Sequence, residues 1–151
     1  MSISLRQGGL ADLEAVYQLN RENFSEYWSR ESLFSALESG YDLLLCEAEC
    51  QVVGYLLSLT VLDEIQIMQI AVFSDYRRQG IASRMTAALA ESLTAADHHV
   101  CAMTLEVRQS NHAARKLYAG LDFEEVGYRK KYYAPDINGN REDAILMTRY
   151  L

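Results

Sequence analysis

The chain has 151 residues, of which half are hydrophobic and 23% are charged, a composition typical of a folded globular protein. Its formal net charge of −7 argues against direct binding to nucleic acid and is compatible with a cationic partner. The apolar runs are too short to span a bilayer, and the N-terminal residues lack an apolar signal core. We therefore expect a cytoplasmic protein that needs no membrane.

The cysteines and histidines predict neither a disulfide framework nor a metal site. The three cysteines, Cys46, Cys50 and Cys101, are an odd number without CxxC spacing. Cys46 and Cys101 lie in strand-like apolar surroundings, where we expect small buried residues. No group of side chains has the spacing of metal ligands, so no metal is expected.

The first forty residues predict one strand and two helices. Ile3–Arg6 alternates apolar and polar residues, as a strand does. Asp12 is suited to cap a helix that runs to about Glu22. Ser29 can cap a second helix that ends at Gly40. The expected buried face of that second helix is Leu33, Phe34 and Leu37.

The next segment predicts a hairpin, a third strand and a basic loop that leads into a helix. The hairpin strands are Asp42–Glu47 and Val52–Leu62, and the third strand is Ile65–Val72. A loop with two arginines and Gly80 then leads into a helix that runs to about Ala96. Because the first N–H groups of a helix lack internal acceptors, this loop is a candidate anion site. The alternative is an ordinary surface connection.

The remaining elements complete an α/β order. Val100–Val107 reads as a strand, and Asn111 can cap a helix with Ala114, Leu117, Tyr118 and Leu121 on one face. Phe123–Tyr133 and Arg141–Tyr150 predict a closing hairpin around a polar turn. This order predicts a single α/β domain, residues 1–151, with a mixed, mostly antiparallel central sheet and helices on both faces.

Glu106 is the clearest candidate for chemistry. It is a carboxylate at the end of an otherwise apolar strand, a position from which it could act as a general base. The alternative is a strand-end glutamate that reaches solvent or pairs with Arg108. Tyr118 can equally be a core tyrosine with a satisfied hydroxyl.

Several motifs together resemble a known family. They are LDE at 62–64, IAV at 70–72, DYRRQGIA at 75–82, LEVRQSN at 105–111, A-x-x-LY at 114–118, the pair Tyr132–Tyr133, and GNREDAILM at 139–147. In this order and at these separations, the motifs resemble the bacterial ribosomal-protein-alanine N-acetyltransferases, a branch of the GNAT acetyltransferases. The resemblance covers nearly the whole chain.

The resemblance implies a GNAT-like fold and an N-acetyltransferase that uses acetyl-CoA as its donor. The acceptor it implies is the N-terminal α-amino group of a protein, such as a basic ribosomal protein that begins with alanine. It implies Glu106 as the general base and Tyr118 as the general acid. The cofactor-binding residues that it implies are Ile70, Ala71, Val72, Arg77, Arg78, Gln79, Gly80, Ile81, Ala82, Ser83 and Asn111. The peptide-binding residues that it implies are Phe24, Tyr27, Trp28, Tyr132 and Tyr133.

Other functions remain open, as do details of the acceptor side. The acceptor could be a lysine side chain or a small amine, and the chain could also be a non-catalytic acyl-CoA-binding module. Tyr27 stands where the related sequences usually carry proline, and Asp122 stands where they carry glycine. Asp122 is expected to matter for backbone conformation, because aspartate tolerates a left-handed turn. Tyr132 and Tyr133 alternate on the predicted strand, so only one should face a groove unless the strand ends there.

Overall fold

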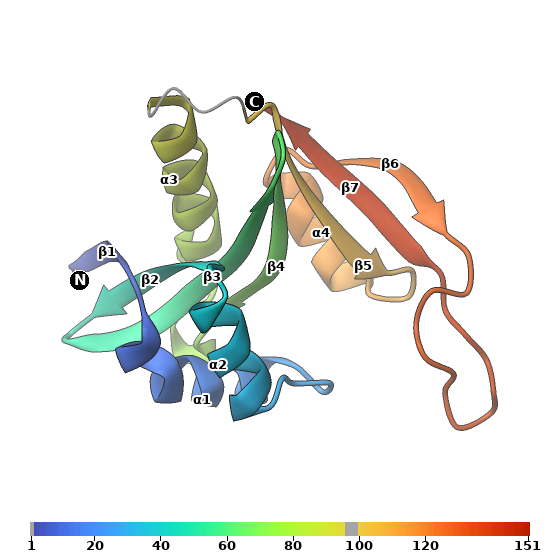
Figure 1. Cartoon of the computed structure of the whole chain (residues 1–151), viewed down its shortest axis with the longest axis horizontal. Helices are drawn as coiled ribbons and strands as arrows, with labels where there is room; N and C mark the ends of the chain where they lie inside the picture. The colour runs from blue at the N-terminus through green and yellow to red at the C-terminus, as the bar shows by residue number, and fades with distance from the viewer. Residues whose placement is uncertain (1, 96–99) are drawn as a thin grey trace. The chain divides into compact units, whose positions relative to one another are not determined.

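The computed structural model describes residues 2–95 and 100–151 (Figure 1). The predicted end of the third helix, near Ala96, lies outside the described residues. The chain forms two compact units, each described by itself below. Unit 1 consists of Met1–Thr60 and Ile67–His98, and unit 2 of Val61–Gln66 and His99–Leu151.

The elements follow the predicted order of strands and helices. Their bounds are β1 (Ile3–Gln7), α1 (Leu13–Asn23), α2 (Arg30–Glu38), β2 (Asp42–Ala48), β3 (Gln51–Val61), β4 (Glu64–Val72), α3 (Ile81–Ala95), β5 (Ala102–Arg108), α4 (His112–Gly120), β6 (Glu124–Arg129) and β7 (Ala144–Tyr150). Short 3₁₀ turns occupy Leu10–Asp12 and Ser74–Tyr76. Among the described residues, no helix is both long and apolar enough to cross a membrane.

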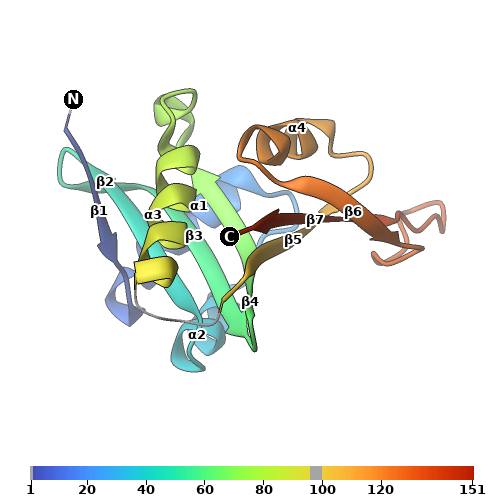
Figure 2. The same cartoon turned by 90° about the horizontal axis from the view of Figure 1, so that it is seen from above.

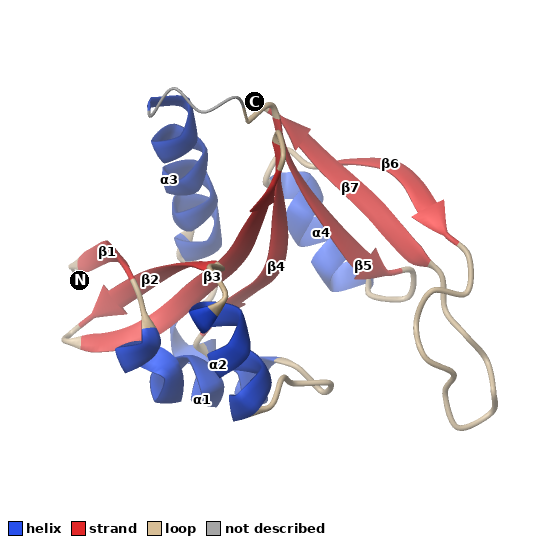
Figure 3. Cartoon of the chain, viewed as in Figure 1, coloured by secondary structure: helices blue, strands red, loops and turns tan. Residues whose placement is uncertain are grey.

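The strands form one sheet in the order β1-β2-β3-β4-β5-β7-β6 (Figure 3). The pairs β1–β2, β2–β3, β5–β7 and β6–β7 are antiparallel, while β4 and β5 are parallel. The parallel ladder joins Glu64–Gln66 to Ala102–Thr104, both within unit 2. The predicted α/β class and the mostly antiparallel sheet are confirmed.

In unit 1, helices cover both faces of the sheet (Figures 1 and 2). On one face, α1 and α2 contribute Val16, Tyr17, Leu19 and Leu33 to a buried cluster with β2 and β3. The strand residues of that cluster alternate along β2 and β3, and Leu45 lies opposite Tyr55 across the two strands. On the other face, α3 packs its first turns near Gly54.

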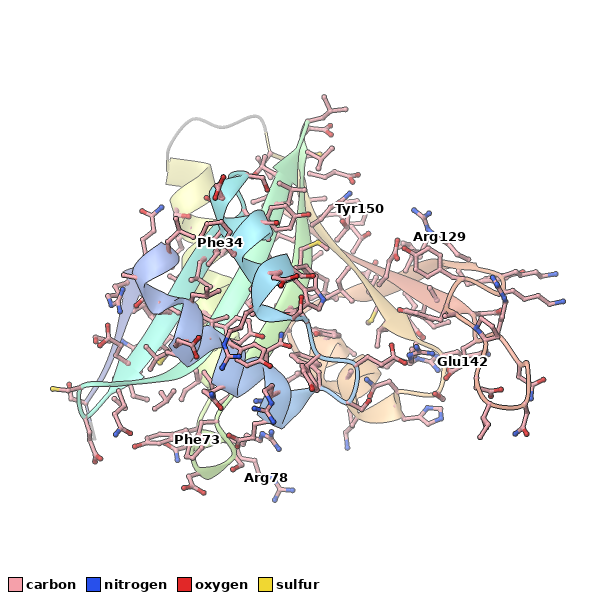
Figure 4. All side chains as sticks on the ribbon, turned by 60° about the horizontal axis from the view of Figure 1, so that its bottom comes forward. Phe34, Phe73, Arg78, Arg129, Glu142 and Tyr150 are labelled. Carbon is pink, nitrogen blue, oxygen red and sulfur yellow. The ribbon has the colours of Figure 1, made fainter. Side chains whose placement is uncertain are left out.

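Three expectations for the N-terminal half need correction. Asp12 precedes α1, but its carboxylate accepts the Gly9 N–H (3.0 Å) and pairs with Arg6 instead of capping the helix. Phe34 is 44% exposed (Figure 4), because it lies about 100° around the helix from Leu33, and Ala36 takes the buried position. The second helix ends at Glu38, with Gly40 beyond it at φ +104°. The Ser29 cap is confirmed by the bond from the Ser32 N–H to Ser29 Oγ (3.1 Å).

Of the two cysteines that were expected to be buried, one is buried and the other is exposed. Cys46 is fully buried on β2, as expected. Cys101 is exposed, contrary to expectation, because β5 begins only at Ala102. Its N–H donates to the Asp63 carbonyl (2.8 Å).

In unit 2, the closing hairpin is confirmed but its strands are shorter than predicted. β6 ends at Arg129, because Lys131 adopts φ +48° and donates its N–H to Asp143 Oδ1 (2.9 Å). The N–H groups of Tyr132 and Tyr133 then both donate to the Glu142 carbonyl, at 3.0 and 3.3 Å. Both tyrosines therefore lie in the loop, so strand alternation does not force them to opposite sides.

The end of α4 confirms the role expected of Asp122. This residue adopts φ +70°, and the Phe123 N–H donates to the Tyr118 carbonyl (3.0 Å), as in a Schellman-type helix end. The turn brings Phe123 onto Tyr118, with ring centroids 5.9 Å apart at an interplanar angle of 67°. Leu117, expected on the buried face, is instead 44% exposed.

Gly54 should be hard to replace, because α3 and β4 pack closely against it. A Cβ at this position would lie 3.2 Å from the Ala71 carbonyl oxygen and 3.4 Å from Ile81 Cγ2. The backbone oxygen has little freedom to move. We expect Gly54→Ala to destabilise the fold by about 1–3 kcal/mol, measured by denaturant unfolding. Gly9→Ala is the matched control, since a Cβ at Gly9 meets nothing within 4 Å. Equal stability of the two variants would contradict the packing argument.

Candidate active site

The loop between β4 and α3 has the geometry of an anion site. Arg78 and Gly80 adopt positive φ values of 63° and 74°, so the chain turns sharply before α3 begins at Ile81. The Gly80 carbonyl accepts the Arg84 N–H (2.9 Å), which makes Gly80 the last residue before the helix. The N–H groups of Ile81, Ala82 and Ser83 therefore have no acceptor within α3, and the positive end of the helix dipole lies there.

The two arginines of this loop differ in their contacts. The Arg77 guanidinium donates to the Val72 carbonyl (3.2 Å) and to Asn23 Oδ1 at the end of α1 (2.6 Å). Ser74 Oγ, in the same loop, donates to Glu22 of α1 (3.2 Å). Arg78 and Gln79 are exposed, and Figure 4 shows Arg78 at the outer edge of unit 1. Arg77 thus holds the loop in place, which the sequence did not predict.

A double-mutant cycle can test whether Arg77 acts through Asn23. Removing either partner should loosen the loop and weaken acetyl-CoA binding, so Arg77→Ala and Asn23→Ala should not be additive. We expect a coupling energy of about 0.5–3 kcal/mol, measured by calorimetric titration of acetyl-CoA. Additive losses would mean that Arg77 contributes independently of Asn23. Arg78→Ala combined with Asn23→Ala is the control pair, for which additivity is expected.

At the end of β4, backbone N–H groups point alternately towards β3 and towards the opposite edge of the strand. The Phe73 N–H donates to the Val53 carbonyl of β3 (2.7 Å). Since successive N–H groups of an extended chain alternate in direction, the Val72 N–H points away from β3. In the described part of the chain, pairing of β4 with β5 is limited to Glu64–Gln66. Ile70 and Ala71 are buried, at 8% and 2% exposure.

In unit 2, Glu106 lies in a cluster of charged and aromatic side chains. It pairs with Arg129 of β6 (Oε1 to Nε 3.2 Å), and its side chain is 31% exposed. Of the open alternatives, the side chain of Glu106 reaches solvent, and it forms an ion pair with Arg129. The Tyr132 hydroxyl hydrogen-bonds to the Glu106 carboxylate, and this bond raises the pKa of Tyr132. The carboxylate therefore already accepts both a cation and a hydrogen bond.

A second set of contacts holds the loop after β6 against the end of β5. The Arg108 guanidinium lies 4.2 Å from the centroid of the Tyr133 ring and 3.6 Å from Glu142. Glu142 also accepts the Ser110 N–H (2.9 Å), and its bonds to Ser110 lower the pKa of its carboxyl group. Figure 4 shows Arg129 and Glu142 on this unit.

Tyr118 is held as a neutral phenol. Burial raises the pKa of its hydroxyl to about 12, so the group keeps its proton at neutral pH and can donate it. Asn111 Oδ1 accepts the Ala114 N–H (3.1 Å), which confirms the predicted cap of α4. The cofactor contact expected of Asn111 stays a prediction.

The pKa of Tyr118 leads to a prediction about alkaline stability. Because the folded pKa of about 12 exceeds the ordinary value of about 10, folding favours the protonated phenol. This contribution is complete below about pH 10 and is lost as the pH rises towards 12. A tyrosinate absorbance titration of the native protein minus that of Tyr118→Phe should show one group titrating near pH 12. In denaturant, the same difference should centre near pH 10. A native difference already centred there would contradict the burial argument.

The predicted peptide-binding residues differ in exposure. Phe24 and Trp28 pack against the core of unit 1, whereas Tyr27 is 47% exposed and lies edge-on to Tyr17 (6.2 Å). In unit 2, Tyr132 is 47% exposed and contacts Tyr133 edge-on (5.2 Å). Tyr27 and Tyr132 therefore present the most ring surface to an acceptor.

The sequence analysis missed one buried polar cluster in unit 1. Asn20, Tyr55 and Gln69 are 0%, 0% and 7% exposed and hydrogen-bond to one another. A signal was present, because Asn20 follows Leu13, Val16 and Tyr17 at helical spacing, and Gln69 alternates with Ile65, Ile67 and Ala71. A polar residue on a buried face usually has a buried partner.

The fold is that of an acyltransferase. Unit 1 offers a helix N-terminus that suits a phosphate-bearing donor, and unit 2 carries a carboxylate and a phenol that are candidates for proton transfer. The model of the Acetyltransferase (GNAT) family matches residues 13–123, and the chain belongs to this family. It is an N-acetyltransferase, and its donor is acetyl-CoA, which GNAT acetyltransferases use. In the described part of the chain, no group of three or more His, Cys, Asp or Glu side chains could hold a metal ion.

The chain is similar along nearly its whole length to named bacterial enzymes. It is 31% identical over 140 residues to the [ribosomal protein bS18]-alanine N-acetyltransferase of Haemophilus ducreyi, covering 93% of this chain and 94% of that protein. It is 35% identical over 136 residues to the enzyme of the same name from Escherichia coli K12, covering 90% and 89%. The crystal structure of the E. coli ribosomal-protein-S18-alanine N-acetyltransferase matches with a TM-score of 0.86 at 32% identity, covering 99% of this chain and 94% of that one.

Proposed function

We propose that the protein transfers the acetyl group of acetyl-CoA to the N-terminal α-amino group of a ribosomal protein that begins with alanine. The observation that carries this proposal is the 31–35% identity, over about nine-tenths of the chain, to enzymes named for that reaction. The net charge of −7 is complementary to a basic ribosomal partner. The reaction would take place in the cytoplasm, and residues 1–151 would form a single N-acetyltransferase domain.

On the donor side, the loop and first turn of α3 suit the pyrophosphate of acetyl-CoA. The N–H groups from Arg78 to Ser83 would bind the pyrophosphate with the support of the helix dipole, and the absence of a side chain at Gly80, which adopts φ +74°, would let the phosphates approach the backbone. Ile70, Ala71 and Val72 would hold the pantetheine arm through backbone hydrogen bonds. Asn111 would also contact the donor.

On the acceptor side, the chemistry begins with removal of a proton from the α-ammonium group. An α-amino group has a pKa near 8, so only about a tenth is neutral at pH 7, whereas a lysine with a pKa of about 10.4 is neutral far less often. Glu106 takes this proton, directly or through a water molecule. Its ion pair with Arg129 supports the role, because it shows that a cation can lie against this carboxylate. The acceptor ammonium would replace the guanidinium there.

The remaining steps need an oxyanion partner and a proton for the leaving group. The neutral amine attacks the thioester carbonyl, and the Val72 N–H stabilises the oxyanion that forms. As the C–S bond breaks, Tyr118 donates its proton to the departing thiolate, which its protonated state at neutral pH permits. The second proton lost by the attacking nitrogen restores the Tyr118 phenol. The products are an N-acetylated N-terminus, the free thiol and the proton held by Glu106. The residues that would contact the acceptor peptide are Phe24, Tyr27, Trp28, Tyr132 and Tyr133.

Removing either proton-transfer group should slow the reaction with an alanine-initiated basic peptide. We expect Glu106→Gln and Tyr118→Phe each to lower kcat by about 10²–10⁴-fold, because each removes one proton transfer. The measurement is thiol release from acetyl-CoA, with mass-spectrometric location of the acetyl group.

The matched control is Glu124→Gln, which changes an exposed glutamate of β6. Its kcat should stay within about twofold of the parent. Full activity in both test variants would refute the assigned roles. Acetyl groups found only on lysine side chains would refute the proposed acceptor while leaving the acetyltransferase assignment intact.

A further inference from the structure

Asn20 holds both ends of the segment that connects α1 to α2. We call Phe24–Ser29 the acceptor loop, because the proposed function places the acceptor peptide against it. The Asn20 backbone carbonyl accepts the Phe24 N–H (3.0 Å), and its side-chain Oδ1 accepts the Trp28 N–H (2.7 Å). One residue therefore fixes the start and the end of this loop.

The orientation of the Asn20 carboxamide follows from these contacts. A backbone N–H can only donate, so the atom facing Trp28 must be the Asn20 oxygen. Its Nδ2 group then faces inward and donates to the Tyr55 hydroxyl (2.8 Å) and to Gln69 Oε1 (2.6 Å). The Tyr55 hydroxyl in turn donates to Gln69 Oε1 (2.9 Å). Each hydrogen bond of the Asn20 side chain therefore has its donor on the side of the acceptor loop and its acceptor on the side of the sheet.

Because this hydrogen-bonded cluster is buried, it favours a single conformation of the acceptor loop. Asn20 and Tyr55 are fully buried and Gln69 is 7% exposed, so no member can exchange its partner for bulk water. Among the described residues, no buried side-chain nitrogen or oxygen lacks a hydrogen-bond partner. Moving Trp28 away would leave a buried acceptor unsatisfied, which is costly.

The cluster also joins the acceptor loop to β4, the strand whose last residues are proposed to hold the pantetheine arm of the donor. Tyr55 lies on β3, and Gln69 lies on β4, three residues before Val72. Next to Trp28, Tyr27 keeps about half of its surface exposed, and Arg21 lies 5.7 Å from its ring centroid. The bond to the Trp28 N–H thus fixes the backbone beside Tyr27, and the cluster links this backbone to β4 within unit 1.

We infer that Asn20, Tyr55 and Gln69 are positioning residues for the acceptor peptide, acting through the Trp28 N–H to hold the acceptor loop in its binding conformation. The inference deepens the proposed function and rests on it for the identity of the acceptor. The hold on the loop itself follows from the hydrogen bonds alone. Loss of the cluster should therefore impair the acceptor side and spare the donor side.

The chain offers a direct probe, because Trp28 is its single tryptophan. We expect Asn20→Ala to speed hydrogen exchange of the Trp28 amide at least tenfold and to increase acrylamide quenching of its fluorescence. Tyr55→Phe, which keeps the bond from Asn20 to Gln69, should give a smaller change of about threefold and provides the test if Asn20→Ala does not fold. These readouts need neither substrate nor turnover.

The kinetic readout separates positioning from general destabilisation. For both variants we expect the KM for an alanine-initiated peptide to rise about fivefold or more, with kcat within about twofold and the Kd of acetyl-CoA unchanged. Leu56→Val is the control for stability, since Leu56 is buried on β3 but alternates with Tyr55 and faces the other side of the sheet. It should leave Trp28 exchange and the peptide KM unchanged.

The outcomes distinguish the inference from the proposed function. Unchanged Trp28 exchange in folded Asn20→Ala or Tyr55→Phe overturns the inference, as does a parallel loss of acetyl-CoA binding. If the parent protein transfers nothing to an alanine-initiated peptide, the proposed acceptor is wrong. Faster Trp28 exchange in the variants would still establish the hold on the loop.

Discussion

The last turn of α1 is the part of unit 1 on which both candidate binding elements depend. Asn20 holds the acceptor loop through the Phe24 and Trp28 N–H groups. Asn23, three residues later, accepts a hydrogen bond from Arg77 of the loop between β4 and α3, residues 73–80, which we call the donor loop. Residues three apart on a helix lie on one side, so a single turn can serve both loops. Because α1 is anchored by buried Val16, Tyr17 and Leu19, the two loops share one rigid support. Their geometry is thus fixed before any substrate binds.

The donor loop depends on a second constraint, the close packing of α3 on the sheet. Ile81 and Met85 pack over Gly54, and a side chain there would meet the Ala71 carbonyl. The same Ile81 begins the helix whose N-terminal N–H groups suit a pyrophosphate. The missing side chain at Gly54 lets α3 pack close to the sheet, and this packing sets the position of the helix N-terminus. The packing of α3 and the proposed anion site therefore depend on the same glycine.

In unit 2, charge pairing organises the groups proposed for proton transfer. Glu106 pairs with Arg129, while Arg108 pairs with Glu142 and covers Tyr133. These exposed or half-exposed pairs contribute little to stability by themselves. Their effect is positional, because they hold the loop after β6 so that the Tyr132 hydroxyl bonds to Glu106. Tyr118 is different, since burial, and not a charged neighbour, raises the pKa of its hydroxyl.

Local chemistry in the sequence was sufficient to predict the order of elements, the Ser29 and Asn111 caps, and the left-handed turn at Asp122, because these depend on residues a few positions apart. The family resemblance came from motifs spread along the chain and needed no coordinates. Only the tertiary structure decided that Cys101 and Phe34 are exposed, that Tyr132 and Tyr133 leave the strand, and that Glu106 pairs with Arg129. The Asn20 cluster belongs with these, since Asn20 lies 35 residues from Tyr55 and 49 from Gln69. Periodicity shows which face is buried, but which distant side chains meet there depends on how the elements pack.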